Sequence, residues 1–181
     1  MCRHHDHFSP TRRQLLLAAA SAGTLAACGQ RPGGRHGLQS AEFTPDTVCV
    51  LDGLRLIDYP GPKAQIHYSG RDAPDFFCDT VEMFHVFLAV ARRQDIRGMF
   101  VQDIGKTGWD EPRGHWIEAR QAHYVQGSTR FGPMGPTLAS FSVSAEAEAF
   151  ARQFGGKLLQ FDDVTPDMVI LDGGALHDTR M

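Results

Sequence analysis

Two stretches of the chain show the same order of hydrophobic and polar patterns. In the first stretch, alternation over residues 64–68 and a short apolar run at 76–78 predict two strands, and an apolar run at 98–101 predicts a third. Asp79 is a suitable helix N-cap, with Glu82 as its capping-box partner. The helix itself is predicted by the i, i+3, i+4, i+7 spacing of Phe84, Phe87, Leu88 and Ala91.

The second stretch repeats this order. Residues 121–125 predict a strand, a Gly/Pro-rich segment at 127–136 predicts a loop, and residues 138–143 predict a second strand. Ser144 is a suitable N-cap, and residues 157–161 predict a last strand. The helical spacing between them is carried by Ala147, Phe150, Ala151 and Phe154.

Each stretch is therefore predicted to form a β-β-α-β unit. The repetition predicts an α+β protein of two similar lobes packed together. We expect the first lobe at residues 43–108 and the second at 109–181. Residues 28–42 are rich in Gly and polar residues, which is typical of a flexible tether.

The pattern before this tether is that of an export signal. Arg12 and Arg13 precede an apolar run at 15–20, which is too short to span a bilayer. The run ends in Leu-Ala-Ala-Cys at 25–28, and this sequence resembles the lipobox of bacterial lipoproteins. We therefore expect residues 1–27 to be a lipoprotein signal peptide and Cys28 to carry the lipid, which holds the protein at a membrane.

The charge of the chain narrows the choice of partners. It has 18 Lys and Arg against 21 Asp and Glu, a formal net charge of −3, and no cluster of basic residues follows the signal. This balance argues against nucleic acid as a partner. The expected location is the periplasmic face of a membrane, with the outer membrane favoured over the inner.

Common catalytic motifs are missing from the sequence. It contains no Gly-x-Ser-x-Gly elbow, no Cys-x-x-Cys pair, no His-Glu-x-x-His and no phosphate-binding glycine loop. We therefore expect a binding or accessory protein rather than an enzyme.

Two cysteines remain once Cys2 and the lipidated Cys28 are set aside. Outside the cytoplasm, Cys49 and Cys78 can form a disulfide, or they can stay thiols because a metal or a redox role needs them. A thiol enzyme is a third reading, and it requires both cysteines beside a carboxylate that donates a proton.

Met134 is the most unusual residue of the chain. It lies between Gly-Pro and Gly-Pro, a setting that excludes a regular helix or a central strand and presents the side chain on a turn. Thiolate and thioether ligands together favour Cu(I), so Cys49, Cys78, Met83 and Met134 are candidate metal ligands, and the turn makes Met134 the most notable of them. Met99 and Met168 have apolar neighbours and are predicted to pack in the core, and the histidines are not paired at a metal-binding spacing.

Several segments together resemble the NosL family. They are Cys-x-Leu-Asp-Gly at 49–53, Asp-Tyr-Pro-Gly-Pro-Lys-Ala-Gln-Ile at 58–66, Phe-Cys-Asp-Thr-x-Glu-Met-Phe at 77–84, Val-Gln-Asp at 101–103, Trp-x-x-Pro at 109–112 and Gly-Pro-Met-Gly at 132–135. The resemblance implies a pair of β-β-α-β lobes, distantly similar in fold to organomercurial lyase. It also implies a Cu(I)-binding lipoprotein that delivers copper for the copper–sulfide centre of nitrous oxide reductase, through a membrane transporter complex.

The resemblance also places the family's ligands on Cys49 and Met134. The family often has Asp-Gly-Met where this chain has Leu54 after Asp-Gly. A third ligand therefore stays open among Met83, Cys78 and a histidine. The alternative function is a periplasmic binding or adaptor lipoprotein with a Cys49–Cys78 disulfide and no metal.

Overall fold

The computed structural model describes residues 37–89 and 95–171, and those from Leu38 onward belong to one compact unit. The predicted signal peptide, most of the predicted tether and Cys28 lie outside the described residues. Within the described part of the chain, no helix combines the length and the apolar character needed to cross a membrane.

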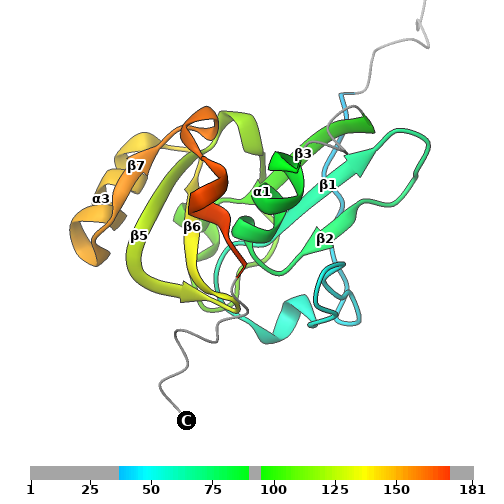
Figure 1. The fold of residues 1–181 in the computed structure, drawn as a ribbon. Coiled ribbons are helices and arrows are strands. Elements are labelled where there is room, and N and C mark those ends of the chain that lie inside the picture. Colours follow the sequence, from blue (N-terminus) through cyan, green and yellow to red (C-terminus); the bar gives the residue numbers. More distant parts are fainter. Residues whose placement is uncertain (1–36, 90–94, 172–181) are drawn as a thin grey trace, which may run out of the picture. The chain divides into compact units, whose positions relative to one another are not determined.

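The first sheet has four strands in the order β2-β1-β3-β4, and all its neighbours are antiparallel (Figure 1). Helix α1 (Thr80–Leu88) follows β2, and the four-residue helix α2 (Ile104–Thr107) follows β3. The strands are β1 (Ala64–Tyr68), β2 (Asp75–Phe77), β3 (Ile96–Gln102) and β4 (Trp116–Glu118).

The second sheet has three antiparallel strands in the order β6-β5-β7. Its strands are β5 (His123–Gly132), β6 (Gly135–Phe141) and β7 (Lys157–Leu159), with α3 (Ser144–Phe154) between β6 and β7. Short 3-10 helices complete the described chain: η1 (Leu56–Asp58), η3 (Ala119–Gln121), η4 (Phe161–Asp163) and η5 (Pro166–Val169).

The element order confirms the predicted α+β fold with two β-β-α-β units, β1-β2-α1-β3 and β5-β6-α3-β7. The first sheet is larger than the pattern alone indicated. Strand β4 pairs with β3, with Val101 opposite Ile117, so this sheet extends past residue 108.

The predicted loop at 127–136 was wrong, because most of it is strand. Strands β5 and β6 form one long hairpin joined at Pro133 and Met134, and the register is irregular between Gln126 and Phe131. Gly127 lies in this irregular part, and its φ of 76° is a conformation that glycine adopts easily. Pro136 lies at the start of β6, where a missing N–H is tolerated. Gly and Pro therefore mark irregular strand positions here.

The remaining boundaries differ from the predictions by a few residues. Helix α3 begins at Ser144, but its N-cap position is Val143, and the Ser144 hydroxyl lies 3.4 Å from Glu148. Phe161, predicted at the end of the last strand, lies in η4.

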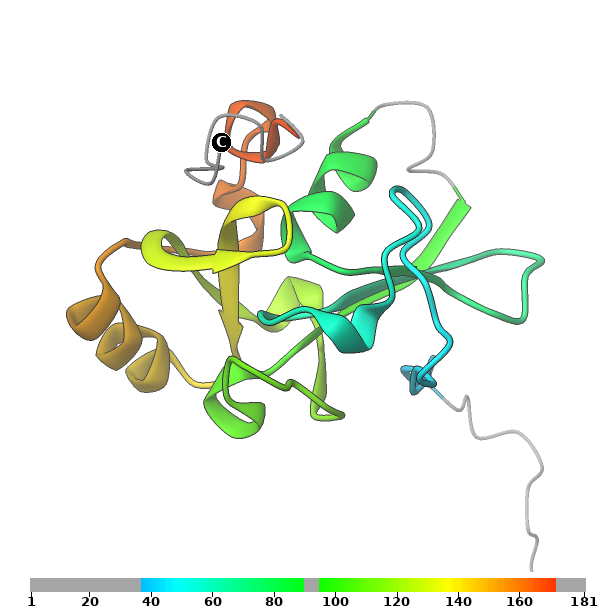
Figure 2. The same ribbon diagram turned by 90° about the horizontal axis from the view of Figure 1, so that it is seen from below.

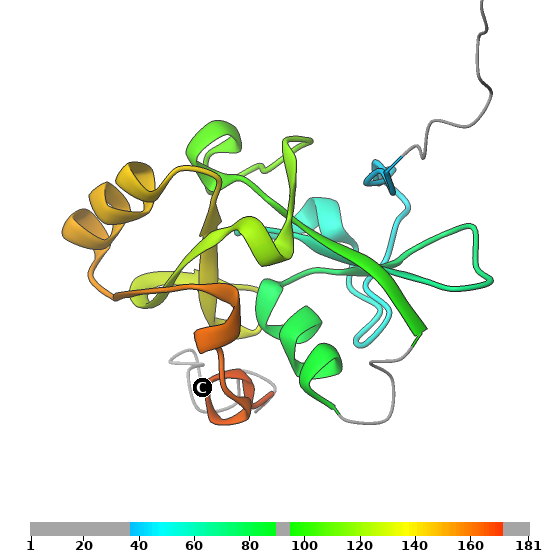
Figure 3. The ribbon, with the colours of Figure 1, turned by 90° about the horizontal axis from the view of Figure 1, so that it is seen from above.

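One hydrophobic core joins the two units. Helix α1 contacts both β1 and β6 and so lies between the sheets, as Figures 1 and 3 show, whereas α3 packs on β5, β6 and β7 of the second sheet. Phe84 on α1 packs edge-on against Tyr124 of β5, with ring centroids 5.1 Å apart, and lies 5.0 Å from Phe161. This packing fixes the start of α1 relative to the second sheet.

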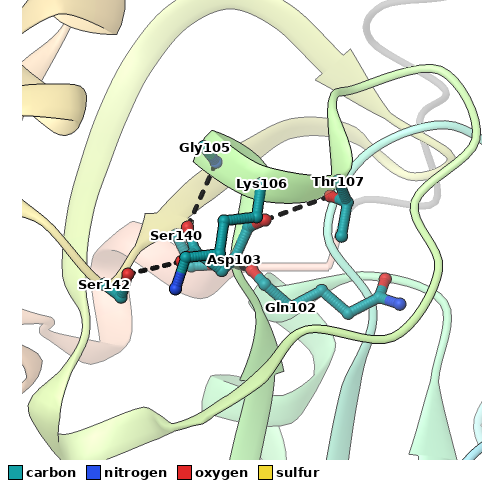
Figure 4. A network of polar contacts seen from close by, with 7 residues as sticks. All are labelled: Gln102, Asp103, Gly105, Lys106, Thr107, Ser140 and Ser142. Atoms are coloured by element: carbon teal, nitrogen blue, oxygen red, sulfur yellow. Dashed lines mark hydrogen bonds and ion pairs between the residues drawn. The ribbon is translucent and has the colours of Figure 1, made fainter.

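A polar network joins the units at the end of β3 (Figure 4). The buried Asp103 carboxylate accepts a hydrogen bond from the Gly105 amide at 3.1 Å and another from the Ser142 hydroxyl at 2.5 Å. Lys106 lies 3.3 Å from the same carboxylate, and Ser140 donates to the Gln102 carbonyl at 2.7 Å. Because Ser140 belongs to β6 and Ser142 follows it, the network fastens the second unit to the first.

Candidate metal centre

Four side chains with metal-binding atoms gather at one place in the first unit. The ligating atoms of Cys49, Asp52, Cys78 and Glu82 all lie within 4.8 Å of one another. Cys49, Cys78 and Glu82 are buried, whereas Asp52 is exposed, so the group reaches solvent on the side of Asp52.

Cys49 and Asp52 come from a tight loop before η1. The loop follows a single bridge between Val48 and Arg55, and it is closed by a hydrogen bond from the Cys49 amide to the Leu54 carbonyl at 2.8 Å. The Asp52 carboxylate accepts from the Leu54 amide at 2.9 Å. Figure 2 shows this cyan segment running beside the green helix α1.

Cys78 lies between β2 and α1, at a position that is fixed on both sides. Asp79 caps the helix, because its carboxylate accepts from the Val81 amide at 2.9 Å and contacts the Thr137 hydroxyl of β6. On the other side, the buried Lys63 ammonium donates to the Cys78 carbonyl at 3.2 Å. It also donates to the carbonyls of the Pro60–Gly61 segment, at 3.0 Å each.

Glu82 was predicted to close a capping box with Asp79, and that prediction was wrong. Its side chain turns instead towards the two sulfur atoms: Glu82 Oε2 lies 3.2 Å from Cys49 Sγ and 3.3 Å from Cys78 Sγ. The other oxygen, Glu82 Oε1, is buried without a hydrogen-bond partner. An unpaired buried carboxyl oxygen is costly, and at Glu82 it faces a group of metal-binding atoms.

The residues of the cluster differ in their protonation state. A hydrogen bond from Cys78 lowers the pKa of Cys49 to about 6, and the Leu51 amide adds a contact at 3.4 Å, so Cys49 is a thiolate at neutral pH. The same hydrogen bond, together with burial, raises the pKa of Cys78. Burial raises the pKa of Glu82 to about 9, so this carboxyl group is protonated at neutral pH. One anionic sulfur, ready for a soft metal ion, therefore lies beside two proton-bearing neighbours.

The Glu82 carboxyl group predicts a pH-dependent stability of the metal-free protein. Its pKa is about 9 when folded and 4.5 when unfolded, so the stability that protonated Glu82 contributes is present below pH 4.5 and is lost as pH rises towards 9. Replacing Glu82 by Gln should change little at pH 5 but should stabilise the apoprotein at pH 8. The gain in free energy of unfolding should be at most about 1.4 kcal/mol for each pH unit between pH 5 and pH 8.

Urea unfolding of the apoprotein at pH 5 and pH 8 measures this effect. The control is Glu148→Gln, at an exposed position on α3 where the partner Arg152 lies 3.8 Å away at the surface. This variant should follow the wild type at both pH values. If the free energy of unfolding changed equally from pH 5 to pH 8 in the wild type and in Glu82→Gln, a buried, protonated Glu82 would be contradicted.

Met134, the second predicted ligand, lies outside this hydrogen-bonded cluster. It occupies the turn between β5 and β6 as predicted, and its side chain is half-buried. Gly132, at the end of β5 before this turn, lies against Asp79, the residue after Cys78. A Cβ on Gly132 would lie 2.0 Å from Asp79 Oδ2, so only glycine fits at this position. The turn therefore leaves the sheet next to the Cys78–Asp79 segment.

The other residues considered as a third ligand have different positions. Met83 is fully buried in the core that joins the units. Met99, which was predicted to pack in the core rather than to bind metal, lies in that core and is 5% exposed. The cluster contains no histidine. His67 lies 2.8 Å from Gln65 Oε1, and His123 lies 3.0 Å from the Gln160 side chain, both as structural contacts.

Cys78 is the candidate that the structure places beside Cys49, and both are free thiols. Asp52 and Glu82 completed the cluster without having been predicted. The available signal was spacing: Cys49 and Asp52 are three residues apart in a tight loop, and Cys78 and Glu82 are four apart across the start of a helix. The two tryptophans pack against other aromatic rings. Trp109 stacks on Phe150 at 5.6 Å, and Trp116 meets the Phe43 ring at 6.4 Å.

Comparisons with known proteins agree on one family. The sequence profile of the NosL family matches residues 40–169. The copper-binding lipoprotein NosL of Stutzerimonas stutzeri is 32% identical over 90% of this chain and 87% of its own length. The copper-binding lipoprotein NosL of Achromobacter cycloclastes is 36% identical over 88% of this chain and 84% of its own length.

A solved structure gives the same result. The crystal structure of the copper chaperone NosL from Shewanella denitrificans matches with a TM-score of 0.69 and 35% identity, over 71% of this chain and 97% of that one. The names of these relatives describe binding proteins and a chaperone rather than enzymes, which agrees with the prediction of a non-enzymatic accessory protein. With the profile covering most of its length and two relatives above 30% identity, the chain belongs to the NosL family.

Proposed function

We propose that this protein is a membrane-anchored Cu(I) chaperone that supplies copper for the copper–sulfide centre of nitrous oxide reductase. The observation that carries the proposal is the cluster of Cys49, Asp52, Cys78 and Glu82, which brings two sulfur atoms within 4.8 Å of each other and reaches solvent at Asp52. The hydrogen bond from Cys78, which lowers the pKa of Cys49, supports Cys49 as the anionic ligand. The names of the relatives, copper-binding lipoproteins and a copper chaperone, support copper as the cargo.

The binding step uses soft ligands. Cys49 supplies an anionic sulfur and Met134 a thioether, a combination that favours Cu(I) over harder ions. Cys78 is the preferred third ligand, because its sulfur shares Glu82 Oε2 with Cys49. Binding at Cys78 requires its proton to leave, and the exposed Asp52, whose Oδ2 lies 3.4 Å from Cys78 Sγ, is the route to water.

The release step follows from the same geometry. The cargo loop, defined as residues 48–54, is a surface turn in which Val50 is 51% exposed and Leu51 is 45% exposed. A few sulfur ligands leave Cu(I) open to attack by a ligand of an acceptor protein, so copper passes by exchange rather than by dissociation. Exposed apolar side chains next to Cys49 suit contact with such an acceptor.

The location and partners complete the proposal. The lipid on Cys28 holds the protein at the periplasmic face of a membrane, with the outer membrane favoured, and residues 28–42 let the folded unit reach its partners. Those partners are nitrous oxide reductase and its membrane transporter assembly complex.

A deletion strain tests this function. Cells without the protein should still make the reductase polypeptide, but with its copper–sulfide centre empty or underfilled, because free Cu(I) is scarce outside the cell. Copper per reductase and the rate of nitrous oxide reduction are the measurements, at limiting copper. Adding back Met168→Ala should restore both, whereas Met134→Ala should not. Full copper loading in the deletion strain would exclude this role.

A further inference from the structure

We infer that Cys49 and Cys78 form a reversible dithiol–disulfide couple, and that a protein dithiol of the cell envelope must reduce it before copper can load. The inference rests on the proposed function. It adds a covalent state of the site and a class of partner, a thiol–disulfide exchange reductant.

The geometry of the two sulfur atoms is the first support. Both lie against the same oxygen, Glu82 Oε2, at 3.2 and 3.3 Å, and their separation is within 4.8 Å. A disulfide needs about 2 Å between the sulfur atoms, so they must approach by less than about 3 Å. Cys49 and Cys78 come from segments 29 residues apart in sequence, and only the fold brings them together.

The supports of the two cysteines show which one moves. Cys78 is held by Lys63 on one side and by the capped start of α1 on the other, as its 3.2 Å carbonyl contact and the Asp79 cap show. Cys49 lies in the cargo loop, whose outer residues are exposed and whose links to the sheet include the bond from the Val50 amide to the Phe76 carbonyl at 2.9 Å. A small shift of this loop brings Cys49 Sγ onto Cys78 Sγ.

The chemistry then limits copper loading. In an oxidising compartment, two neighbouring thiols outside a metal complex lose two electrons and two protons to a partner's disulfide, which becomes a dithiol. The product has no thiolate, and the thiolate is the species that binds the metal. The oxidised protein therefore cannot hold Cu(I) at Cys49.

Reduction reverses each step. A thiolate of the reductant attacks one sulfur of the Cys49–Cys78 bond, and a mixed disulfide forms while the other cysteine leaves as a thiolate and takes up a proton. The second thiol of the reductant then resolves the mixed disulfide. The reductant departs as a disulfide, and the chaperone has regained both thiols.

Thiol counting over a range of potentials tests the couple. The full-length lipoprotein in detergent, free of copper, is equilibrated with mixtures of reduced and oxidised dithiothreitol, which form no lasting mixed disulfides. It is then acid-quenched, unfolded and tagged with a maleimide. The mature monomer should pass from two tagged thiols to none in one two-electron transition. Cys49→Ser and Cys78→Ser should each keep one tagged thiol throughout.

Copper binding provides the second measurement. The oxidised wild type should bind Cu(I) at least about 100-fold more weakly than the reduced form, because it has lost its thiolates. A thioredoxin-type protein dithiol, used as the probe reductant, should restore binding. Cys78→Ser should keep the same Cu(I) affinity before and after the oxidising treatment.

Two outcomes would overturn the couple: two thiols that persist at the most oxidising mixture, or disulfides found only between molecules. In either case, Cu(I) binding by the reduced protein would leave the proposed function standing. A reduced protein that does not bind Cu(I) would instead contradict the proposed function, while the thiol count would still report the disulfide by itself.

Discussion

Replacing Cys49 by Ser is expected to lower the Cu(I) affinity of the reduced protein by at least about 100-fold. Losing a residue that only orients a ligand already costs about 10- to 100-fold in metal affinity, and Cys49 is proposed as the ligand itself. It is also the thiolate of the cluster at neutral pH, with a pKa of about 6. A serine hydroxyl replaces a soft anion by a neutral, hard oxygen, which Cu(I) does not favour.

Competition with a colorimetric Cu(I) chelator measures this loss. Met134→Ala should also weaken binding, because a site of few ligands has none to spare. Met168→Ala is the matched control: it removes the same side chain from a half-buried position against the core, beside Val169. It should keep the wild-type Cu(I) affinity and lose at most about 2 kcal/mol of stability.

The ligand assignments can fail separately. Equal Cu(I) affinity in the wild type and Met134→Ala would contradict Met134 as a ligand without touching copper binding as such. Unchanged affinity in Cys49→Ser would contradict the site itself, because Cys49 supplies the anionic sulfur of the cluster.

Replacing Cys28 by Ser is expected to release the protein from membranes almost completely. Cys28 lies outside the described residues, so this prediction rests on the lipobox at 25–28. Two acyl chains give stable anchoring, and no helix within residues 37–89 and 95–171 is long and apolar enough to replace them. Fractionation of cells into membrane and soluble parts is the measurement.

Cys49→Ser is the matched control for anchoring, because it changes a cysteine of the folded unit and should leave the protein in the membrane fraction. Mass spectrometry of the wild type should show a diacylglyceryl cysteine as the first residue of the mature chain. An unmodified mature terminus at another residue would contradict a lipid anchor on Cys28.

The fold followed from local patterns to a large extent. The strand pattern at 64–68 and the helical spacing through Phe84 and Phe87 predicted β1 and α1. The alternation in β1 does not mark one buried face, because all five of its residues are buried. The pattern failed at 127–136, where three glycines and two prolines lie in an irregular β-hairpin rather than in a loop. Local propensity indicates a break at such residues, but pairing between β5 and β6 continues past it.

The site was predicted only in part, for a related reason. Met134 stood out because Gly-Pro on both sides dictates a turn, which is a local property. Glu82 was misjudged because its position three residues after Asp79 suits a capping box equally well. Which way its side chain turns depends on Cys49, a residue 33 positions earlier.

The sequence by itself determined the two β-β-α-β units, the turn at Met134, the expected export signal and the soft character of Cys49. Each follows from short-range periodicity, backbone sterics or side-chain chemistry. Only the tertiary structure decided that Cys49, Asp52, Cys78 and Glu82 lie within 4.8 Å of one another. The reason is physical: the partners come from a surface loop and a helix start, held together by the Lys63 and Asp79 contacts and by packing against the second unit, and no local rule encodes that distance.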